Sequence, residues 1–266
     1  MSNAIISYKA SFIDGHVFIE IPQTNKNLLR ALIDTGSSTT LSSSHKILNL
    51  CGSEFNTSQS ELFGASTHNL EDLIGQKIDY LIGNDVLCQF SFEIRKNKMS
   101  FYSINTAEPE MDPVNGSIEC ELISYPLDRL MTLPIMKVET PFKTSKMYFD
   151  TGAKLSYGSK KWFSSIPKDG SSLNGTRFLG KEDDFHPSIG KFKSEIYSMP
   201  VVITSDSLGA ERGFNGSAQL NMKFGILPKR LDYMVTTFEG VEGIFGSELL
   251  EYCNSIFLTN DRMYIY

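Results

Sequence analysis

The chain has 266 residues, of which 41% are hydrophobic and 21% are charged, and its net charge is −6. This length is enough for one large domain or for two small lobes with cores of their own, and the composition is ordinary for a globular protein. The acidic balance argues against nucleic acid as a partner and offers no basic face to a membrane surface. No apolar run approaches the roughly 18 residues that span a bilayer.

Alternating hydrophobic and polar residues near the N-terminus predict strands over Val17–Ile21 and Leu28–Ile33. Beyond them the pattern is less regular. We expect a short helix over His45–Leu50 and a helical segment over Thr67–Ile74 that is capped by Asn69. Because sustained helical periodicity is scarce along the chain, the predicted fold class is mostly β with short helices.

Two apolar strands of the sequence end in Asp-Thr-Gly. The first, Ala31–Ser38, contains Asp34, and the second, Met147–Ala153, contains Asp150. Burying a lone carboxylate is costly, so each acid is expected at the edge of a core, on a tight turn that its glycine permits. One such motif is typical of a plain strand and turn, but two in the same context suggest that the acids meet.

A second pair of motifs follows the first. Asp79–Leu87 and Glu242–Leu250 share the order acid, any residue, two apolar residues, glycine, polar residue, acid and two apolar residues. Their glycines, Gly83 and Gly246, are each followed at the same spacing by a β-rich segment. The repeated order predicts an internal duplication with one lobe in each half of the chain.

The two halves meet at an acidic segment that contains two prolines. We predict an N-terminal lobe over residues 1–106, a linker over 107–116 and a C-terminal lobe over 117–266. The second Asp-Thr-Gly lies about twice as far from its downstream glycine as the first does, which indicates an insertion in the second half. Within it, Gly225–Met234 is expected to be irregular, with Pro228 as a breaker.

Two Asp-Thr-Gly motifs, each followed by an apolar-apolar-Gly motif, resemble the aspartic proteases of the pepsin and retropepsin type. The resemblance covers nearly the whole chain and implies a bilobal, mostly β acid-protease fold. It implies an aspartic endopeptidase that acts on a peptide or protein substrate as a monomer, without a metal or other cofactor. The alternative is a catalytically silent module that keeps the fold and holds a peptide or a partner in its cleft.

By this resemblance, Asp34 and Asp150 are the catalytic pair. Two close carboxylates share a proton, so the ionised one draws a proton from water and the protonated one donates to the substrate carbonyl. Ala153 stands where the first turn has a serine and cannot support Asp150 through a hydroxyl. Thr35 and Thr151 are implied to hydrogen-bond across the two turns, and Gly36 and Gly152 to allow close approach of the backbones. Ser37 is implied to steady Asp34. Gly83 and Gly246 are implied to let the returning chain pack behind each turn.

The segment Phe185–Tyr197 has two β-prone arms around a tip that contains serine and glycine, and it resembles a retropepsin flap. The first half leaves little room for such a hairpin, apart from a trimmed remnant at Leu62–Ala65. We therefore expect the second half to supply the lid that excludes water. An ordinary surface hairpin is the alternative. The tip residues expected to contact substrate are His186, Ser188, Ile189 and Gly190.

Other kinds of site have little support in the sequence. The four histidines show no metal-binding spacing and are expected to be surface or loop residues, and neither a Gly-X-Ser-X-Gly elbow nor a nucleotide-binding loop is present. The N-terminus lacks a signal-peptide core. The cysteines have no paired spacing, which favours free buried thiols in a reducing, cytoplasmic compartment; they are Cys51, Cys88, Cys120 and Cys253.

Overall fold

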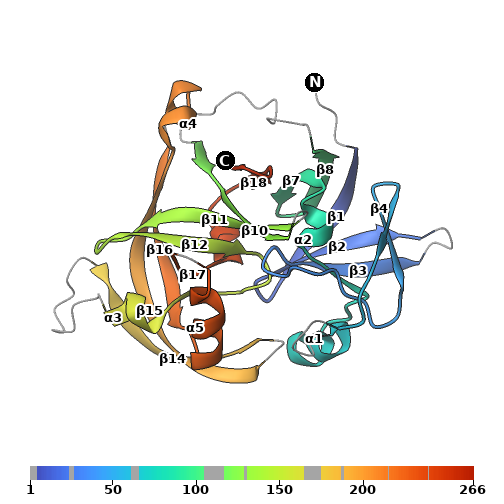
Figure 1. The fold of residues 1–266 in the computed structure, drawn as a ribbon, viewed down its shortest axis with the longest axis horizontal. Coiled ribbons are helices and arrows are strands. Elements are labelled where there is room, and N and C mark those ends of the chain that lie inside the picture. The colour runs from blue at the N-terminus through green and yellow to red at the C-terminus, as the bar shows by residue number, and fades with distance from the viewer. Residues whose placement is uncertain are drawn as a thin grey trace.

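A computed structural model describes residues 5–23, 27–60, 66–104, 117–128, 131–164, 175–186, 189–214, 216–238 and 240–266. The described chain is mostly strand and forms two large sheets, of which the first combines strands from both halves and the second consists of strands from the second half, so the predicted mostly β, bilobal fold class is confirmed (Figure 1). The predicted linker and the segment Leu62–Ala65 lie outside the described residues.

The first sheet has nine strands in the order β6-β3-β2-β1-β8-β7-β18-β19-β9. Its last strands come from the end of the chain, since β18 pairs with β7 and β19 pairs with β9. The sheet therefore ties both ends of the sequence together. In chain order its strands are β1 (Ile6–Ile13), β2 (His16–Pro22), β3 (Leu28–Ile33), β6 (Tyr80–Ile82), β7 (Phe90–Arg95), β8 (Lys98–Ser103), β9 (Ile118–Glu121), β18 (Ser255–Leu258) and β19 (Arg262–Ile265).

The second sheet has eight strands in the order β10-β11-β12-β17-β13-β16-β15-β14. The strands that the insertion supplies, β14 to β16, extend this sheet at one side (Figure 1). In chain order the strands are β10 (Ile123–Asp128), β11 (Met131–Glu139), β12 (Thr144–Asp150), β13 (Ser156–Gly158), β14 (Arg177–His186), β15 (Gly190–Thr204), β16 (Ser217–Ile226) and β17 (Val241–Gly246).

The remaining elements are short and lie around the two sheets. The hairpin of β4 (Ile47–Leu50) and β5 (Ser53–Asn56) packs on the first sheet, where Tyr80 donates from its hydroxyl to the carbonyl of Ile47 at 2.9 Å. The helices are α1 (Thr67–Ile74), α2 (Asn84–Leu87), α3 (Lys160–Ser164), α4 (Ser207–Glu211), α5 (Lys229–Thr236) and the 3₁₀ helix η2 (Ser247–Glu251).

Several local predictions are corrected by the structure. The expected helix over His45–Leu50 is instead strand β4, and the expected lack of room for a hairpin in the first half is wrong, because β4 and β5 form one. Its turn places Cys51 and Gly52 at positive φ, 55° and 79°, the backbone that a two-residue hairpin turn needs. The four-residue run of β strand outcompetes the weak helical pattern.

The helix over Thr67–Ile74 is confirmed, but its cap is Ser66, whose hydroxyl accepts the N–H of Asn69 at 3.3 Å. The segment Gly225–Met234 is not irregular, because it contains the end of β16 and most of α5. Pro228 stands immediately before α5, where its fixed φ suits the start of a helix and its missing N–H costs nothing.

The main hydrophobic core runs through both lobes and packs behind the two strands that end in aspartate. Ile33 and Phe149, the residues directly before Asp34 and Asp150, are fully buried in it. Since side chains alternate along a strand, the next residue faces away from the core. Each apolar anchor contributes about 1.5–3 kcal/mol by burial and thereby directs the following carboxyl group into the cleft.

Within the described ranges, no helix combines the length and the apolar character needed to cross a lipid bilayer. The four cysteines are free thiols. Burial raises the pKa of Cys120 to about 12 and the pKa of Cys51 to about 11. Because the thiolate is the reactive form, these two thiols are unreactive at neutral pH; Cys120 is buried, whereas the other three cysteines are half-buried.

Candidate active site

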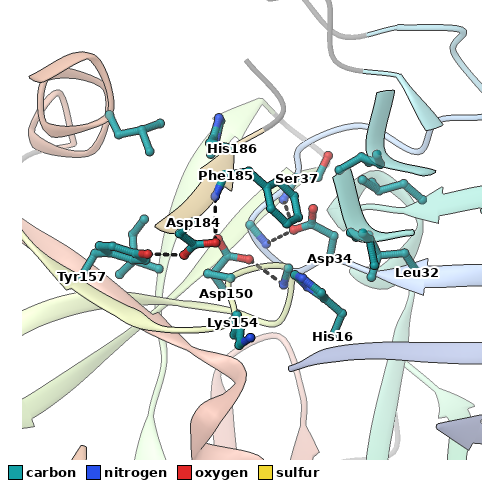
Figure 2. Close-up of a pocket in the computed structure, with 18 of the residues that line it drawn as sticks. His16, Leu32, Asp34, Ser37, Asp150, Lys154, Tyr157, Asp184, Phe185 and His186 are labelled. Atoms are coloured by element: carbon teal, nitrogen blue, oxygen red, sulfur yellow. Dashed lines mark hydrogen bonds between the residues drawn. The ribbon is translucent and has the colours of Figure 1, made fainter. Parts of the chain in front are cut away.

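Asp34 and Asp150 occupy matching places in the two lobes. Asp34 directly follows β3, and its N–H donates to the carbonyl of Ile82 in β6 at 3.0 Å, while Asp150 is the last residue of β12. Each of these strands pairs with a parallel strand, β3 with β6 and β12 with β17. The two acids come together in the cleft (Figure 2).

Backbone amides of each turn hold the carboxyl group of the same turn. The N–H groups of Gly36 and Ser37 donate to Oδ1 of Asp34 at 3.0 and 2.9 Å. In the second lobe, the N–H of Gly152 donates to Oδ1 of Asp150 at 2.8 Å. In each turn, backbone amides thus fix the plane of the carboxyl group. These hydrogen bonds favour the ionised form of the carboxyl group.

The residue that follows each Asp-Thr-Gly supports the aspartate through its backbone N–H, although this residue is Ser37 in the first turn and Ala153 in the second. The hydroxyl of Ser37 donates to the carbonyl of Thr39 at 2.9 Å, while its amide supports Asp34. The backbone of Ala153 is hydrogen-bonded to Asp150 in the same way. The amide therefore supplies in the second turn a support that the alanine side chain cannot.

Thr35 and Thr151 bind the two turns to each other by reciprocal hydrogen bonds. The N–H of Thr35 donates to Oγ1 of Thr151 at 3.1 Å, and the N–H of Thr151 donates to Oγ1 of Thr35 at 3.0 Å. Each hydroxyl then donates onward at 2.8 Å, Thr35 to the carbonyl of Phe149 and Thr151 to that of Ile33. Both threonines are fully buried, so the four bonds form a closed network away from water.

The glycines of the turns let the two carboxyl groups approach. A β-carbon on Gly36 would stand 2.3 Å from Cγ of Asp150, and one on Gly152 would stand 2.5 Å from Cγ of Asp34. No side chain fits at these separations, so glycine is required at both positions. Each carboxyl group therefore lies directly over the backbone of the opposite turn.

Burial raises the pKa of Asp150 from its ordinary value, although the Gly152 amide and a hydrogen bond with Asp34 act in the opposite direction. Two carboxyl groups in contact cannot both ionise at low cost, so they share one proton. Burial also raises the pKa of Tyr148 well above its ordinary value, and its hydroxyl is hydrogen-bonded to Asp150. The phenol thus stays protonated and adds a donor on the Asp150 side of the pair.

Gly83 and Gly246 take up equivalent positions behind the two turns. The N–H of Gly83 donates to Oγ1 of Thr40 at 3.0 Å, and the N–H of Gly246 donates to Oγ of Ser156 at 3.0 Å. A β-carbon on Gly83 would meet the carbonyl carbon of Thr39 at 2.8 Å. These glycines admit the returning chain against the back of each turn and do not line the cavity.

A cavity of about 100 Å³ lies over the two aspartates. Since a water molecule takes up about 30 Å³ in the liquid, this space holds a few waters or one side chain. Its walls come from both lobes and include α1, the β1–β2 turn and the β14–β15 hairpin. The polar and aromatic side chains that line the cavity include His16, Tyr148, Lys154, Tyr157, Asp184, Phe185 and His186.

The β14–β15 hairpin reaches across the cleft to the first lobe. Phe185 packs against a cluster of first-lobe side chains that includes Phe18 and Leu70, and Leu70 belongs to α1. Figure 1 shows the end of β14 close to this helix. Asp184, next along the strand, accepts a hydrogen bond from the hydroxyl of Tyr157 (Figure 2), which fixes the hairpin to the second lobe.

The residues expected at the flap tip have different surroundings. His186 lines the cavity, and burial lowers its pKa to about 4. Ile189 packs against the second-lobe hydrophobic cluster, so the contacts with the cavity come from Phe185 and His186. Gly190 has a φ of 75° at the start of β15, the left-handed backbone that glycine adopts without strain. Ser188 lies outside the described residues.

Sequence reasoning missed five polar residues of the site, which are His16, Tyr148, Lys154, Tyr157 and Asp184. His16, expected on the surface or in a loop, is only 3% exposed and lines the cavity. Tyr157 and Asp184 come from distant parts of the chain and meet only in the folded structure. A signal was present for His16, because it follows the Asp-Gly of a tight turn at the start of an apolar strand, where alternation places it inward.

The described residues contain no group of three or more histidine, cysteine, aspartate or glutamate side chains arranged to hold a metal ion. Both aspartates and Tyr157 of the cleft have hydrogen-bond partners in side chains or backbone amides, whereas His16 has none in the described part of the chain. What the arrangement provides chemically is a pair of carboxyl groups that share a proton beside a small cavity with largely apolar walls.

Neither a protein-family model nor a curated protein matches this chain. Among solved structures, a retropepsin-like aspartic protease from Rickettsia conorii is similar, with 17% identity and a TM-score of 0.34, over 56% of this chain and 89% of that one. The protein edgp is also similar, with 13% identity and a TM-score of 0.34, over 53% of this chain and 38% of that one.

We predict that Thr35→Val destabilises the protein by about 2–4 kcal/mol, because it leaves the buried N–H of Thr151 and the carbonyl of Phe149 without partners. Chemical denaturation measures the change in the free energy of unfolding. Thr236→Val is the matched control, since this hydroxyl donates to the carbonyl of Asp232 on an exposed helix. Equal effects of the two substitutions would contradict a special role for the buried network.

A second prediction concerns pH. An acid whose pKa is raised on folding binds its proton more tightly in the folded state. The stability it contributes is therefore complete below its unfolded pKa of about 3.9 and is lost as the pH rises through the folded pKa. We expect Asp150→Asn to melt at a higher temperature than the parent protein at pH 7, with the difference narrowing towards pH 4.

The exposed Asp183, whose side chain is 79% accessible, supplies the control for this pH series. Asp183→Asn should show no comparable pH-dependent gain, because water solvates the charge of Asp183 in both states. If Asp150→Asn were less stable than the parent at neutral pH, burial would not be the dominant effect on this carboxyl group.

Proposed function

We propose that the chain is an aspartic endopeptidase, which hydrolyses peptide bonds through a water activated by Asp34 and Asp150. The observation that carries the proposal is the pairing of the two turns, in which reciprocal threonine bonds hold each carboxyl group over the glycine of the other turn. A merely structural pair of buried acids gains nothing from such contact, because like charges repel and desolvation is costly.

The surroundings of the two acids favour different roles. Burial raises the pKa of Asp150, so the shared proton resides mainly there, and Asp150 donates it to the substrate carbonyl. Asp34, whose Oδ1 accepts two amide hydrogens, is the ionised partner and takes a proton from the attacking water. The tetrahedral intermediate then breaks its C–N bond as a proton passes to the amine nitrogen.

The β14–β15 hairpin serves as the lid of this site. It covers the aspartates from the second lobe and rests on the first through Phe185. In this role the hairpin lifts to admit a peptide to the cavity that it lines and then closes over the bound chain. Its strand arms offer backbone groups with which an extended peptide can pair.

The same features support proposals about the oligomeric state, the origin and the cellular compartment of the enzyme. Both aspartates come from one chain, which supports action as a monomer, and the matched bonds behind Gly83 and Gly246 support an origin by internal duplication. We keep the division into lobes at residues 107–116 and a reducing, cytoplasmic compartment as parts of the proposal; the four free thiols support the latter.

The first test of the function is the replacement of either aspartate. Asp34→Asn or Asp150→Asn should abolish cleavage of a random peptide library at every pH, because the water loses its base or the carbonyl loses its acid. A peptide with a central hydroxyl in place of the scissile carbonyl should inhibit the parent protein. Asp183→Asn is the matched control and should cleave normally.

Two results of this test would count against the proposal. Cleavage that survives both replacements would place the activity elsewhere. Peptide binding by the parent protein without any cleavage would favour the silent binding module instead, since the fold would then be retained without the chemistry.

A further test addresses the lid. Phe185→Ala removes the contact between the hairpin and the first lobe, so we expect KM to rise and kcat to fall together. Phe178 lies on the same strand but is 53% exposed, and Phe178→Ala is the control that should leave both constants unchanged. Equal kinetics of the two variants would show that the hairpin does not cover the substrate.

A further inference from the structure

His16 is a buried polar side chain with unfulfilled hydrogen-bonding capacity beside the two aspartates. It is 3% exposed, and neither Nδ1 nor Nε2 has a hydrogen-bond partner among the described residues. The backbone of Gly152 lies close enough to act weakly on its pKa but outside hydrogen-bond geometry. The ring lines the cavity and tilts against Phe185 with a centroid separation of 5.8 Å (Figure 2).

The position of this ring is fixed by contacts across the cleft. His16 follows the β1–β2 turn, in which Gly15 has a φ of 79° and accepts a hydrogen bond at its carbonyl from the hydroxyl of Ser247. Asp14 of the same turn forms an ion pair with Lys154. A β-carbon on Gly15 would stand 2.5 Å from Cγ of Lys154. The turn is thus docked on the second lobe, and the imidazole cannot swing out to water without breaking these contacts.

The ring is held in its neutral form. Burial lowers the pKa of His16, and Lys154 acts in the same direction, while the carboxylates of Asp14 and Asp184 act against it. A neutral imidazole has one N–H donor and one acceptor nitrogen. A buried polar group without a partner costs about 1–3 kcal/mol, so a ligand that supplies the missing partner recovers this cost when it binds.

We propose that His16 is a specificity-determining residue, which hydrogen-bonds an uncharged polar side chain, an amide or a hydroxyl, of the bound peptide. This inference rests on the proposed peptidase function. The apolar walls formed by Leu32 and Phe185 penalise any charge. The aspartate pair and Asp184 repel a substrate carboxylate, and the neutral imidazole supplies no negative charge with which a substrate cation could pair. A neutral hydrogen-bonding group is what remains.

The proposal predicts a preference that a single substitution removes. Positional scanning of peptide substrates should find one position at which glutamine or asparagine is favoured over leucine by about 10- to 100-fold in kcat/KM, since an unpaired polar group is left when leucine binds. In His16→Leu this ratio should fall to one or below, because the leucine peptide no longer leaves an imidazole without a partner. His16→Gln, which keeps both a donor and an acceptor, should restore the preference.

The exposed His68 provides the control, because His68→Leu changes the same residue type outside the cavity. Its substrate profile should equal that of the parent protein. Thermal unfolding checks the fold of each variant, and His16→Leu should be at least as stable as the parent, because it replaces an unpartnered polar group by an apolar one. An unchanged profile in His16→Leu would overturn the proposal.

Binding measurements separate this inference from the peptidase function. Two peptides with the scissile amide reduced to CH₂–NH, one with glutamine and one with leucine at the selected position, are titrated calorimetrically into the parent protein and into His16→Leu. Selective binding of the glutamine peptide by the parent alone supports the role of His16 even if no peptide is cleaved. Equal binding of the two peptides by the parent, or binding of neither at any scanned position, overturns it.

Discussion

Two carboxyl groups in contact, shielded from water, set the terms for the rest of this structure. Two unit charges 4 Å apart repel by about 4 kcal/mol at an effective dielectric constant of 20, so Asp34 and Asp150 remain together only if they share a proton and cannot move apart. The four threonine bonds supply that rigidity, and the glycines remove the side chains that would separate the turns. The burial of the two carboxyl groups costs free energy of folding, and the packing of the strands that carry them offsets this cost.

The lobes are joined by more than the two turns. The last strands of the chain, β18 and β19, complete the sheet of the first lobe, and the β1–β2 turn docks on Lys154 and Ser247 of the second lobe. A shift of one lobe relative to the other would break the sheet, the ion pair and the threonine network together. These contacts therefore hold the floor of the cleft in place.

The sequence was informative where local pattern and packing agree. Apolar runs that end in Asp-Thr-Gly predicted the strands before Asp34 and Asp150, and the helix over Thr67–Ile74 was predicted as a capped segment, although its cap proved to be Ser66. The sequence pattern was misleading where a turn determined the local secondary structure. The Cys51-Gly52 turn converts the expected helix before it into a hairpin strand, and Pro228, interpreted as a breaker, begins a helix.

The site residues that sequence reasoning missed share a physical reason. The bond between Tyr157 and Asp184 joins strands 27 positions apart, and no local signal marks a side-chain pair created by sheet topology. No motif or repeat in the sequence marks His16. Its burial follows from the docking of the β1–β2 turn on the other lobe, which depends on contacts more than 130 residues away. The pairing of Asp34 and Asp150 could be predicted because a repeated motif marks it twice, whereas no repeated motif marks the walls of the cavity.

The walls of the cavity are asymmetric. The β14–β15 hairpin of the second lobe lines it and packs on the first lobe through the apolar contact of Phe185, while Tyr157 is hydrogen-bonded to Asp184. Burial of one aromatic side chain contributes about 1.5–3 kcal/mol, small enough for a bound peptide to replace. Lifting the tip would uncover His16 beneath Phe185. The same movement that admits a peptide would therefore present the imidazole to it, so that recognition at His16 and closure of the lid become parts of one binding step.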